Sequence, residues 1–354
     1  MKKLYIAFCF VLMALAETRA QDPQFTQFYA APLYLNPAFA GSSHLPRVVA
    51  NYRNQWSGLP ASFSTYSASY DHWFKNYNSG AGVILLHDKA GATNLKSTSV
   101  AGTYSYELKI SDRIKLRSGL EFGLTQRTLD YSRFVFGDQL LDDQGNIGTT
   151  LNPSSQEQLD GAQGRASYLD VGTGFLLYSK TLFLGVVGKH LNQPNQSMVD
   201  GSAPLPIKYA IHGGAKLPLG GGGRGRRGRT RSRQLEMEKT ITPAFMYRTQ
   251  GKYDQLDLGA YVHYNPMILG VWYRGMSLLK KEGLKMNNQD AIAVLIGFQQ
   301  DNFTFGYSYD VTVSQLGFST AGSHELSMSV EIPTNNNRKR KGSRRDHVIP
   351  CPKF

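Results

Sequence analysis

The chain has 354 residues, among them 36 glycines, 20 tyrosines and 18 phenylalanines, and carries a formal net charge of +13. Beyond residue 20 no apolar run approaches the roughly 20 residues that a membrane-spanning helix needs, which excludes a helical membrane protein. The length is large for one soluble β-sandwich but suits a single barrel of a dozen or more strands. The chain is therefore either soluble in an exported compartment or inserted as a β-barrel.

Residues 1–20 have the features of a signal peptide. Two lysines precede an apolar run over residues 4–15, and small residues stand at the positions before the end of the segment that a signal peptidase reads, the last being Ala20. The apolar run is shorter than a membrane anchor requires. We therefore expect export and a mature start at Gln21.

The chain contains two cysteines, Cys9 and Cys351. Cys9 leaves with the signal peptide, so no disulfide can form within the mature chain. Cys351 either pairs with another protein in an oxidising compartment or lies docked in an interface without such a bond. We favour the docked state.

The segment 21–46 is not strand-like, because four prolines remove donors that a β-ladder needs. Five aromatic residues in this segment are candidates for a plug: Phe25, Phe28, Tyr29, Tyr34 and Phe39. Irregular apolar backbone cannot face lipid, so we expect the segment to pack inside a barrel lumen or under its periplasmic mouth. A disordered tail is the alternative, which the aromatic content disfavours.

From residue 47 onward, apolar and polar residues alternate with the period of a strand that has one face toward lipid. Leu120, Phe122 and Leu124, for example, alternate with Glu121 and Thr125. Tilted strands of about 9–11 residues are long enough to cross a bilayer. The pattern predicts an all-β, antiparallel outer-membrane β-barrel over 47–332 with about 14 strands: 47–57, 62–74, 79–89, 95–110, 113–130, 167–178, 181–191, 206–217, 238–249, 253–264, 267–276, 290–300, 302–311 and 323–332.

Successive connections must lie at alternate ends of such a barrel. With the N-terminus in the periplasm, the periplasmic set contains the tight turns 75–78, 111–112, 179–180, 265–266 and 301. The opposite set contains the long loops 131–166, 192–205, 277–289 and 312–322. Short periplasmic turns and long outer loops are typical of outer-membrane barrels. One periplasmic connection, 218–237, breaks this rule because it is long and basic.

Two basic segments hold most of the net charge. The first lies in the loop 218–237 and the second in the tail 333–354, which the alternation of ends also places in the periplasm. With Cys351 they are candidates for docking a partner: Arg224, Arg226, Arg227, Arg229, Arg231, Arg233, Arg338, Lys339, Arg340, Lys341, Arg344 and Arg345. Alternatively, they lie on anionic lipid or keep this face soluble. Nucleic acid is a poor candidate, because the arginines lack interleaved aromatic residues.

Three sequence motifs carry a family resemblance. QDPQFTQFYAAPLYLNPAFAG at 21–41, YRNQW at 52–56 and TYSASYD at 65–71 resemble the PorP/SprF family of type IX secretion system membrane proteins from Bacteroidetes. The resemblance implies a fourteen-strand outer-membrane barrel similar to the long-chain fatty-acid transporter family. It also implies a non-enzymatic part in secretion and gliding, with periplasmic components of the machine and a cognate secreted adhesin-like protein as partners. The arginine-rich insert is not part of the family pattern.

The residues themselves favour a structural and interaction protein in the outer membrane, without cofactor or metal. The eight histidines stand singly, and neither a Gly-x-Ser-x-Gly element nor a His-x-x-x-His pair is present. Asp138, Asp142 and Asp143 lack the regular spacing of a dedicated calcium loop. The alternative function is a channel or transporter for small apolar solutes, by analogy of fold.

Four charged residues stand at inward positions of the expected strands: Lys115, Arg117, Glu121 and Arg127. They either set the selectivity of an open pore or pair with one another and with the segment 21–46. Fourteen strands leave a lumen wider than wall side chains alone can fill. Either the segment 21–46 plugs the lumen or water passes.

Overall fold

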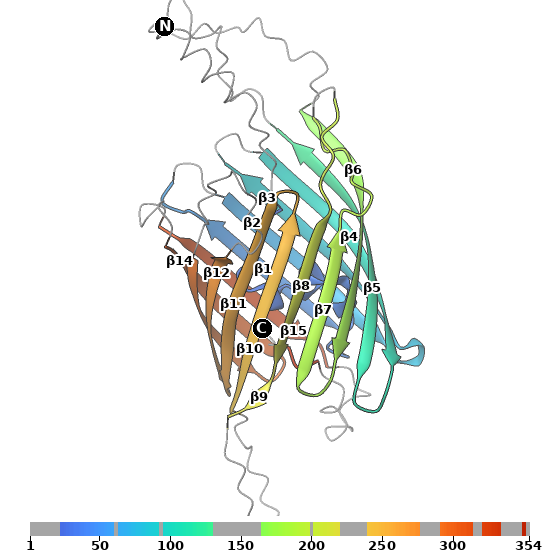
Figure 1. Ribbon diagram of the computed structural model, residues 1–354, viewed down its shortest axis with the longest axis vertical. Helices are drawn as coiled ribbons and strands as arrows, with labels where there is room; N and C mark the ends of the chain where they lie inside the picture. The colour runs from blue at the N-terminus through green and yellow to red at the C-terminus, as the bar shows by residue number, and fades with distance from the viewer. Residues whose placement is uncertain are drawn as a thin grey trace, which may run out of the picture.

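The computed structural model describes residues 22–59, 63–91, 95–129, 164–198, 201–219, 239–276, 291–313, 321–333 and 349–351. The described strands form one antiparallel sheet that closes on itself into a barrel (Figure 1). Each strand pairs with its neighbour in the chain, and β1 (Arg47–Gln55) also pairs with β15 (Ser323–Glu331), which completes the circle. A closed sheet has no free edge, so every backbone group in the wall has a partner available within it.

Fourteen barrel strands are present among the described residues, as the sequence predicts, and each lies within two residues of its expected bounds. They are β1 and β15 as given above, β2 (Phe63–Phe74), β3 (Ser79–Ala90), β4 (Leu95–Lys109), β5 (Lys115–Thr128), β6 (Arg165–Tyr178), β7 (Leu182–Lys189), β8 (Lys208–Ala215), β10 (Lys239–Gln250), β11 (Tyr253–Tyr264), β12 (Met267–Met276), β13 (Ala291–Gln300) and β14 (Phe303–Thr312). A further two-residue strand, β9 (Leu217–Pro218), extends the sheet beside β10. The sequence did not predict β9 as a separate strand, because two residues are too few to show an alternation of apolar and polar side chains.

The alternation of side chains is that of a membrane barrel. In β5, Phe122 is 61% exposed and Leu124 is 55% exposed, whereas their neighbours Glu121 and Thr125 are buried. The outward face is therefore apolar and the inward face is polar and charged. This arrangement suits lipid outside and a packed or wet lumen inside.

The connections divide between the two ends of the barrel. The tight turns at 75–78, 110–114, 179–181, 265–266 and 301–302 share one end with the start of β1, and we call this the turn end. The opposite end, which we call the loop end, carries the connections after β5, β7, β12 and β14. It also carries the two-residue turn 251–252, so its connections are not uniformly long.

The described helices are all short: η1 (Phe28–Ala30), α2 (Pro32–Leu35), η2 (Pro37–Phe39) and η3 (Lys75–Tyr77). Within the described ranges, no helix is long and apolar enough to cross a membrane. Three of the four lie in the N-terminal segment, which we define as residues 22–46. Prolines stand at the first positions of α2 and η2, where a missing N–H costs nothing.

Val271 gives a direct test of the lipid-facing surface. It lies near the middle of β12, is 56% exposed, and neighbours the buried Trp272 on the other face. We expect Val271→Arg to lower the free energy of unfolding of the inserted barrel by about 2–4 kcal/mol, because it places a charge near the bilayer midplane. Denaturant titration in lipid vesicles would measure the loss, with Val271→Ala as the control. A near-neutral arginine would contradict the placement.

Candidate functional site

The lumen of the barrel is occupied by the N-terminal segment. Its aromatic residues Phe25, Phe28, Tyr29 and Phe39 are each at most 5% exposed, and Tyr34 is partly buried. The short helices of the segment contact the inward faces of β3, β4, β5, β6 and β15. The segment starts beside His190 at the loop end and leaves at the turn end, where it continues into β1.

Near the loop end, one carboxylate holds two consecutive amides of the segment. Glu325 accepts hydrogen bonds from the backbone N–H groups of Thr26 at 2.7 Å and Gln27 at 2.9 Å. The Gln27 side chain is also fixed, because it donates to Ser308 and accepts from Ser327. These contacts satisfy amides that have no ladder partner inside the barrel.

The charge of Glu325 is balanced by a buried network. Arg53 lies 3.1 Å from Glu325 and 2.9 Å from Asp310, and Arg274 lies 2.8 Å from Asp310. The Thr26 hydroxyl donates to Asp310 at 2.6 Å. Two arginines and two carboxylates leave this group without net charge, as burial requires.

In the middle of the lumen, the segment packs through aromatic rings. Phe28 meets Trp272 of β12 with ring centroids 4.7 Å apart, and Tyr29 meets Phe183 of β7 at 5.6 Å. Phe39 stacks on His212 of β8 at 5.8 Å. All of these rings except that of His212 belong to an apolar cluster shared by the segment and the wall. Burial of such rings contributes a large share of packing energy.

Toward the turn end, Arg117 of β5 binds the main chain of the segment through hydrogen bonds. Its guanidinium donates to the carbonyl oxygens of Ala38 at 2.9 Å and Ala40 at 2.5 Å, and its charge is paired with Glu107 at 2.9 Å. Asp71 of β2 accepts from the backbone N–H of Gly41 at 2.8 Å. Wall side chains thus bind both the carbonyl and the N–H groups of the segment's backbone.

Two wall glycines make room for this backbone. A Cβ atom on Gly119 would lie 2.2 Å from the amide nitrogen of Ala38, and one on Gly174 would lie 2.1 Å from the Asn36 side-chain oxygen. By contrast, a Cβ atom on Gly102 would meet nothing within 4 Å. The wall is therefore shaped to the segment at 36–38, where any side chain would force it away.

The loop-end start of the segment is held by ion pairs. His190 lies between Asp22 and Asp170, with a ring nitrogen 2.9 Å from a carboxylate oxygen of each, and Lys208 lies 3.1 Å from Asp22. Burial alone would lower the pKa of His190, but the two carboxylates outweigh it and raise the pKa to about 9. Burial alone would raise the pKa of Asp22, but Lys208 and His190 hold it well below its usual range. Both groups are charged at neutral pH.

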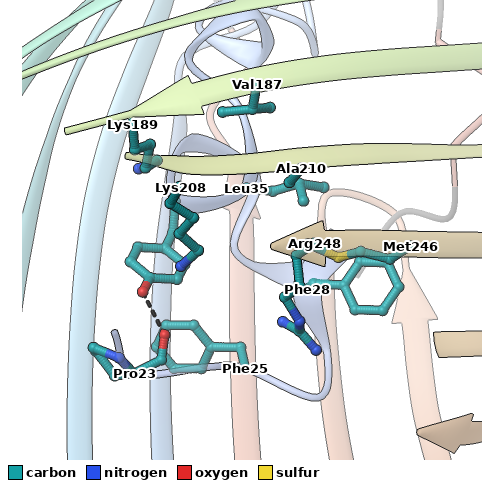
Figure 2. A pocket seen from close by; sticks show the side chains of 11 residues that line it. Pro23, Phe25, Phe28, Leu35, Val187, Lys189, Lys208, Ala210, Met246 and Arg248 are labelled. Atoms are coloured by element: carbon teal, nitrogen blue, oxygen red, sulfur yellow. Dashed lines mark hydrogen bonds between the residues drawn. The ribbon is translucent and has the colours of Figure 1, made fainter. Parts of the chain in front are cut away.

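Beside this start lies a cavity of about 420 Å³, partly open to solvent. Figure 2 shows Pro23 and Phe25 of the segment facing Lys189 and Lys208 of the wall. The cations that line it are already paired with carboxylates: Lys189 with Glu121, Lys208 with Asp22, and Arg248 with Asp257. The positive charges that line the cavity are therefore neutralised by carboxylates of the same chain.

The four inward charges singled out in the sequence all have partners within the barrel. Lys115 and Arg117 both pair with Glu107, and Glu121 pairs with Lys189. Arg127 donates to Gln196. Of the two alternatives for these residues, the geometry favours pairing over an open charged pore.

The sequence did not single out Arg53, Asp71, Arg274, Asp310 or Glu325, which bind the segment. A signal was present, because each is a charged residue at an inward position of a predicted strand. The two basic segments, at 224–233 and 338–345, lie outside the described residues. Cys351 lies half-buried at the turn end, against the apolar cluster of the lumen. In the described ranges, no group of three or more histidine, cysteine or acidic side chains is placed to hold a metal ion.

A family model described as "Type IX secretion system membrane protein PorP/SprF" matches residues 17–330. The chain belongs to the PorP/SprF family. The resemblance carried by the N-terminal motifs is thereby confirmed, and the fold is that of an outer-membrane β-barrel in this secretion family. No curated protein matches the chain.

Three solved structures similar to this PorP/SprF protein are a transporter, BamA and a porin. The toluene transporter TodX of P. putida is 11% identical with a TM-score of 0.45, covering 85% of this chain and 93% of TodX. BamA from Haemophilus ducreyi, lacking POTRA domains 1–3, is 6% identical with a TM-score of 0.38, covering 82% of this chain and 70% of that one. A mutant porin of Rhodopseudomonas blastica is 7% identical with a TM-score of 0.33, covering 81% and 99%.

Gly119→Ala tests how tightly the wall fits the segment. The added Cβ atom meets backbone atoms of residues 37 and 38, so we expect it to destabilise seating of the segment by about 1–3 kcal/mol. More frequent openings in planar bilayers would report this, and deletion of 24–39 gives the reference for an emptied lumen. Gly102→Ala is the matched control, since its Cβ atom enters open space. Equal conductance in both variants would contradict the fit.

The pKa of His190 makes the loop-end anchor depend on pH. Its folded-state pKa of about 9 lies above its ordinary value, so the stabilisation is complete below about pH 6.5 and is lost as the pH rises through 9. The full loss is about 3 kcal/mol, at 1.36 kcal/mol for each pKa unit. We expect hydrogen exchange in peptide 22–29, corrected for intrinsic rates, to rise over this range relative to peptide 37–45. In His190→Gln it should be fast already at pH 6.5 and lose this dependence; an unchanged pH profile would overturn the assignment.

Proposed function

We propose that this PorP/SprF protein is a non-enzymatic docking and anchoring component of the type IX secretion machinery. In this proposal its turn end faces the periplasm after removal of residues 1–20. There it binds periplasmic components of the machine, and the barrel anchors or helps export one cognate secreted surface protein. The lumen is closed by the N-terminal segment, which acts as a plug.

The observation that carries the proposal is the way the lumen is filled. Wall side chains bind the main chain of the plug at Thr26, Gln27, Ala38, Ala40 and Gly41. A passive channel gains nothing from such a fitted occupant, because every contact has to break before solutes pass. A barrel that works through its surfaces instead gains rigidity from a filled core.

The basic segments supply a means of docking at the turn end. The described residues on either side of each segment lie at the turn end: β9 and the start of β10 flank the first, and 332–333 and 349–351 flank the second. Clustered positive charge speeds encounter with an acidic partner and favours the correct orientation. Exposed pairs contribute only about 0–1 kcal/mol each, so this charge tunes docking rather than supplying all of it.

A channel for small apolar solutes is the second candidate. The cavity in Figure 2 favours it, because Phe25, Phe28 and Met246 form much of its apolar lining. Passage would still require the plug to leave its contacts with Arg117 and Glu325. Solute flux that depends on movement of the plug would support this candidate.

Replacement of the six arginines of 224–233 by serine tests the docking proposal. We expect the barrel to insert normally but its co-purification with periplasmic machine components to weaken by roughly 2 kcal/mol at low salt, since exposed pairs contribute 0–1 kcal/mol each. The loss should shrink as salt rises, because screening acts over about 8 Å at physiological ionic strength. Lys89→Ser, Lys96→Ser and Lys252→Ser together provide a control at the loop end.

Two results would contradict this reading. Unchanged binding and salt dependence in the six-arginine variant would assign the insert to lipid contact or solubility. An equal loss per charge removed in the loop-end control would mean that total charge, rather than its position, governs the association.

A further inference from the structure

The turn-end mouth is occupied by a second segment of the chain. Ile349 is only 3% exposed and belongs to the same apolar cluster as Phe28, Tyr29 and Phe39 of the plug. Pro350 is buried, and Cys351 is half-buried against the cluster. Residues 349–351 therefore return to the lumen after the wall has ended at β15.

The return places these residues beside a space that the plug and the wall also border. Ile349 and Cys351 border a space of about 590 Å³ whose other boundaries include Tyr29, Pro32 and Phe39 of the plug. The same space is also bounded by Arg47, Ser329 and Glu331, at the turn-end limits of β1 and β15. Residues 349–351 and the plug therefore border the same space, which lies where the plug leaves the lumen.

The packing differs in kind from that of the plug. The plug is fixed by a series of charged and polar contacts along its length, whereas the described part of the return is three residues long and joins the apolar cluster through Ile349 and Cys351. Fewer described residues hold the return than hold the plug. A segment held in this way opens before its neighbour does.

We propose that residues 349–351 form a strap that latches the plug at the turn end. Because the strap shares an apolar cluster with Tyr29 and Phe39 and borders the space where the plug leaves the lumen, the plug cannot move toward the turn end until the strap has left. Release of the strap therefore precedes release of the plug. The basic stretch 338–345 ends four residues before Ile349 in the sequence, so a partner bound to that stretch would pull directly on the strap. Only this last step rests on the proposed function.

Cross-linking to Cys351 tests the position of the strap in the full-length protein. Ser329 and Ser323 are both buried at inward positions of β15, six residues apart, which separates them by roughly 20 Å. A short bifunctional thiol reagent should join Cys351 to Ser329→Cys, near the turn end, and should fail with Ser323→Cys at the loop end. Equal cross-linking at both positions, or at neither, would overturn the strap.

Labelling of Cys351 with a polar maleimide tests its release. We expect Cys351 to react roughly tenfold more slowly than a cysteine at the exposed turn position Asp112→Cys, placed in a Cys351→Ser background. Ile349→Asp should bring Cys351 to the exposed rate and raise the frequency of bilayer openings, whereas Ile349→Val should leave both unchanged. Cys351→Ser alone reports any labelling at Cys9.

The outcomes separate the strap from the docking proposal. Fast labelling of Cys351 in the unaltered protein, or no response to Ile349→Asp in a barrel that still shows heat-modifiable mobility, would remove the strap. Faster labelling without more frequent openings would remove the latch on the plug. Neither result bears on co-purification of the six-arginine variant, which tests docking alone.

Discussion

The buried main chain of the N-terminal segment is the constraint on which the rest of the lumen depends. Residues 22–46 have no ladder partner, and each buried amide or carbonyl left without one costs about 1–3 kcal/mol. The wall meets this need with charged groups: Glu325 accepts from two amides and Arg117 donates to two carbonyls. Those charges in turn require counter-charges, which explains the pairing of Arg117 with Glu107 and of Glu325 with Arg53.

The fit between plug and wall is specific rather than generic. A lumen that accepted any polypeptide would need only distributed donors and acceptors. Here the wall also omits a side chain at Gly119 and Gly174, opposite the turn made by Asn36, Pro37 and Ala38. Backbone chemistry and wall shape therefore select the same segment, and the motif around these residues carries part of the family resemblance.

The fold was largely predictable from sequence because its main determinant is local. Apolar and polar residues alternate with a period of two in stretches such as Leu120 to Thr125. This alternation indicates which residues form a strand, which of its faces points to lipid and how long it is. The closed antiparallel order then follows from the short connections between strands. The pairing of the lumen charges was not predictable in the same way. Arg53 meets Asp310 across 257 positions of sequence only because β1 and β15 join to close the barrel.

The same distinction applies to the candidate sites. Large aromatic side chains such as those of Phe25 and Phe39 are expected to be buried, so the sequence alone predicted a packed segment. The return of Ile349 carried no such signal, because one isoleucine near a basic tail has no period and no motif. Its position depends on a mouth formed jointly by the plug, β1 and β15, and such a surface exists only after closure.

Closure also determines where motion can occur in this molecule. The wall cannot change its circumference without breaking a ladder of hydrogen bonds between two strands, and no free edge offers an easier start. The plug is held by separate groups of wall side chains that can break one at a time, and residues 349–351 pack against the apolar cluster of the lumen. In the proposed latch, displacement of residues 349–351 would pass to the plug, which runs from Phe39 and Tyr29 to Thr26 and to Asp22 at the loop end.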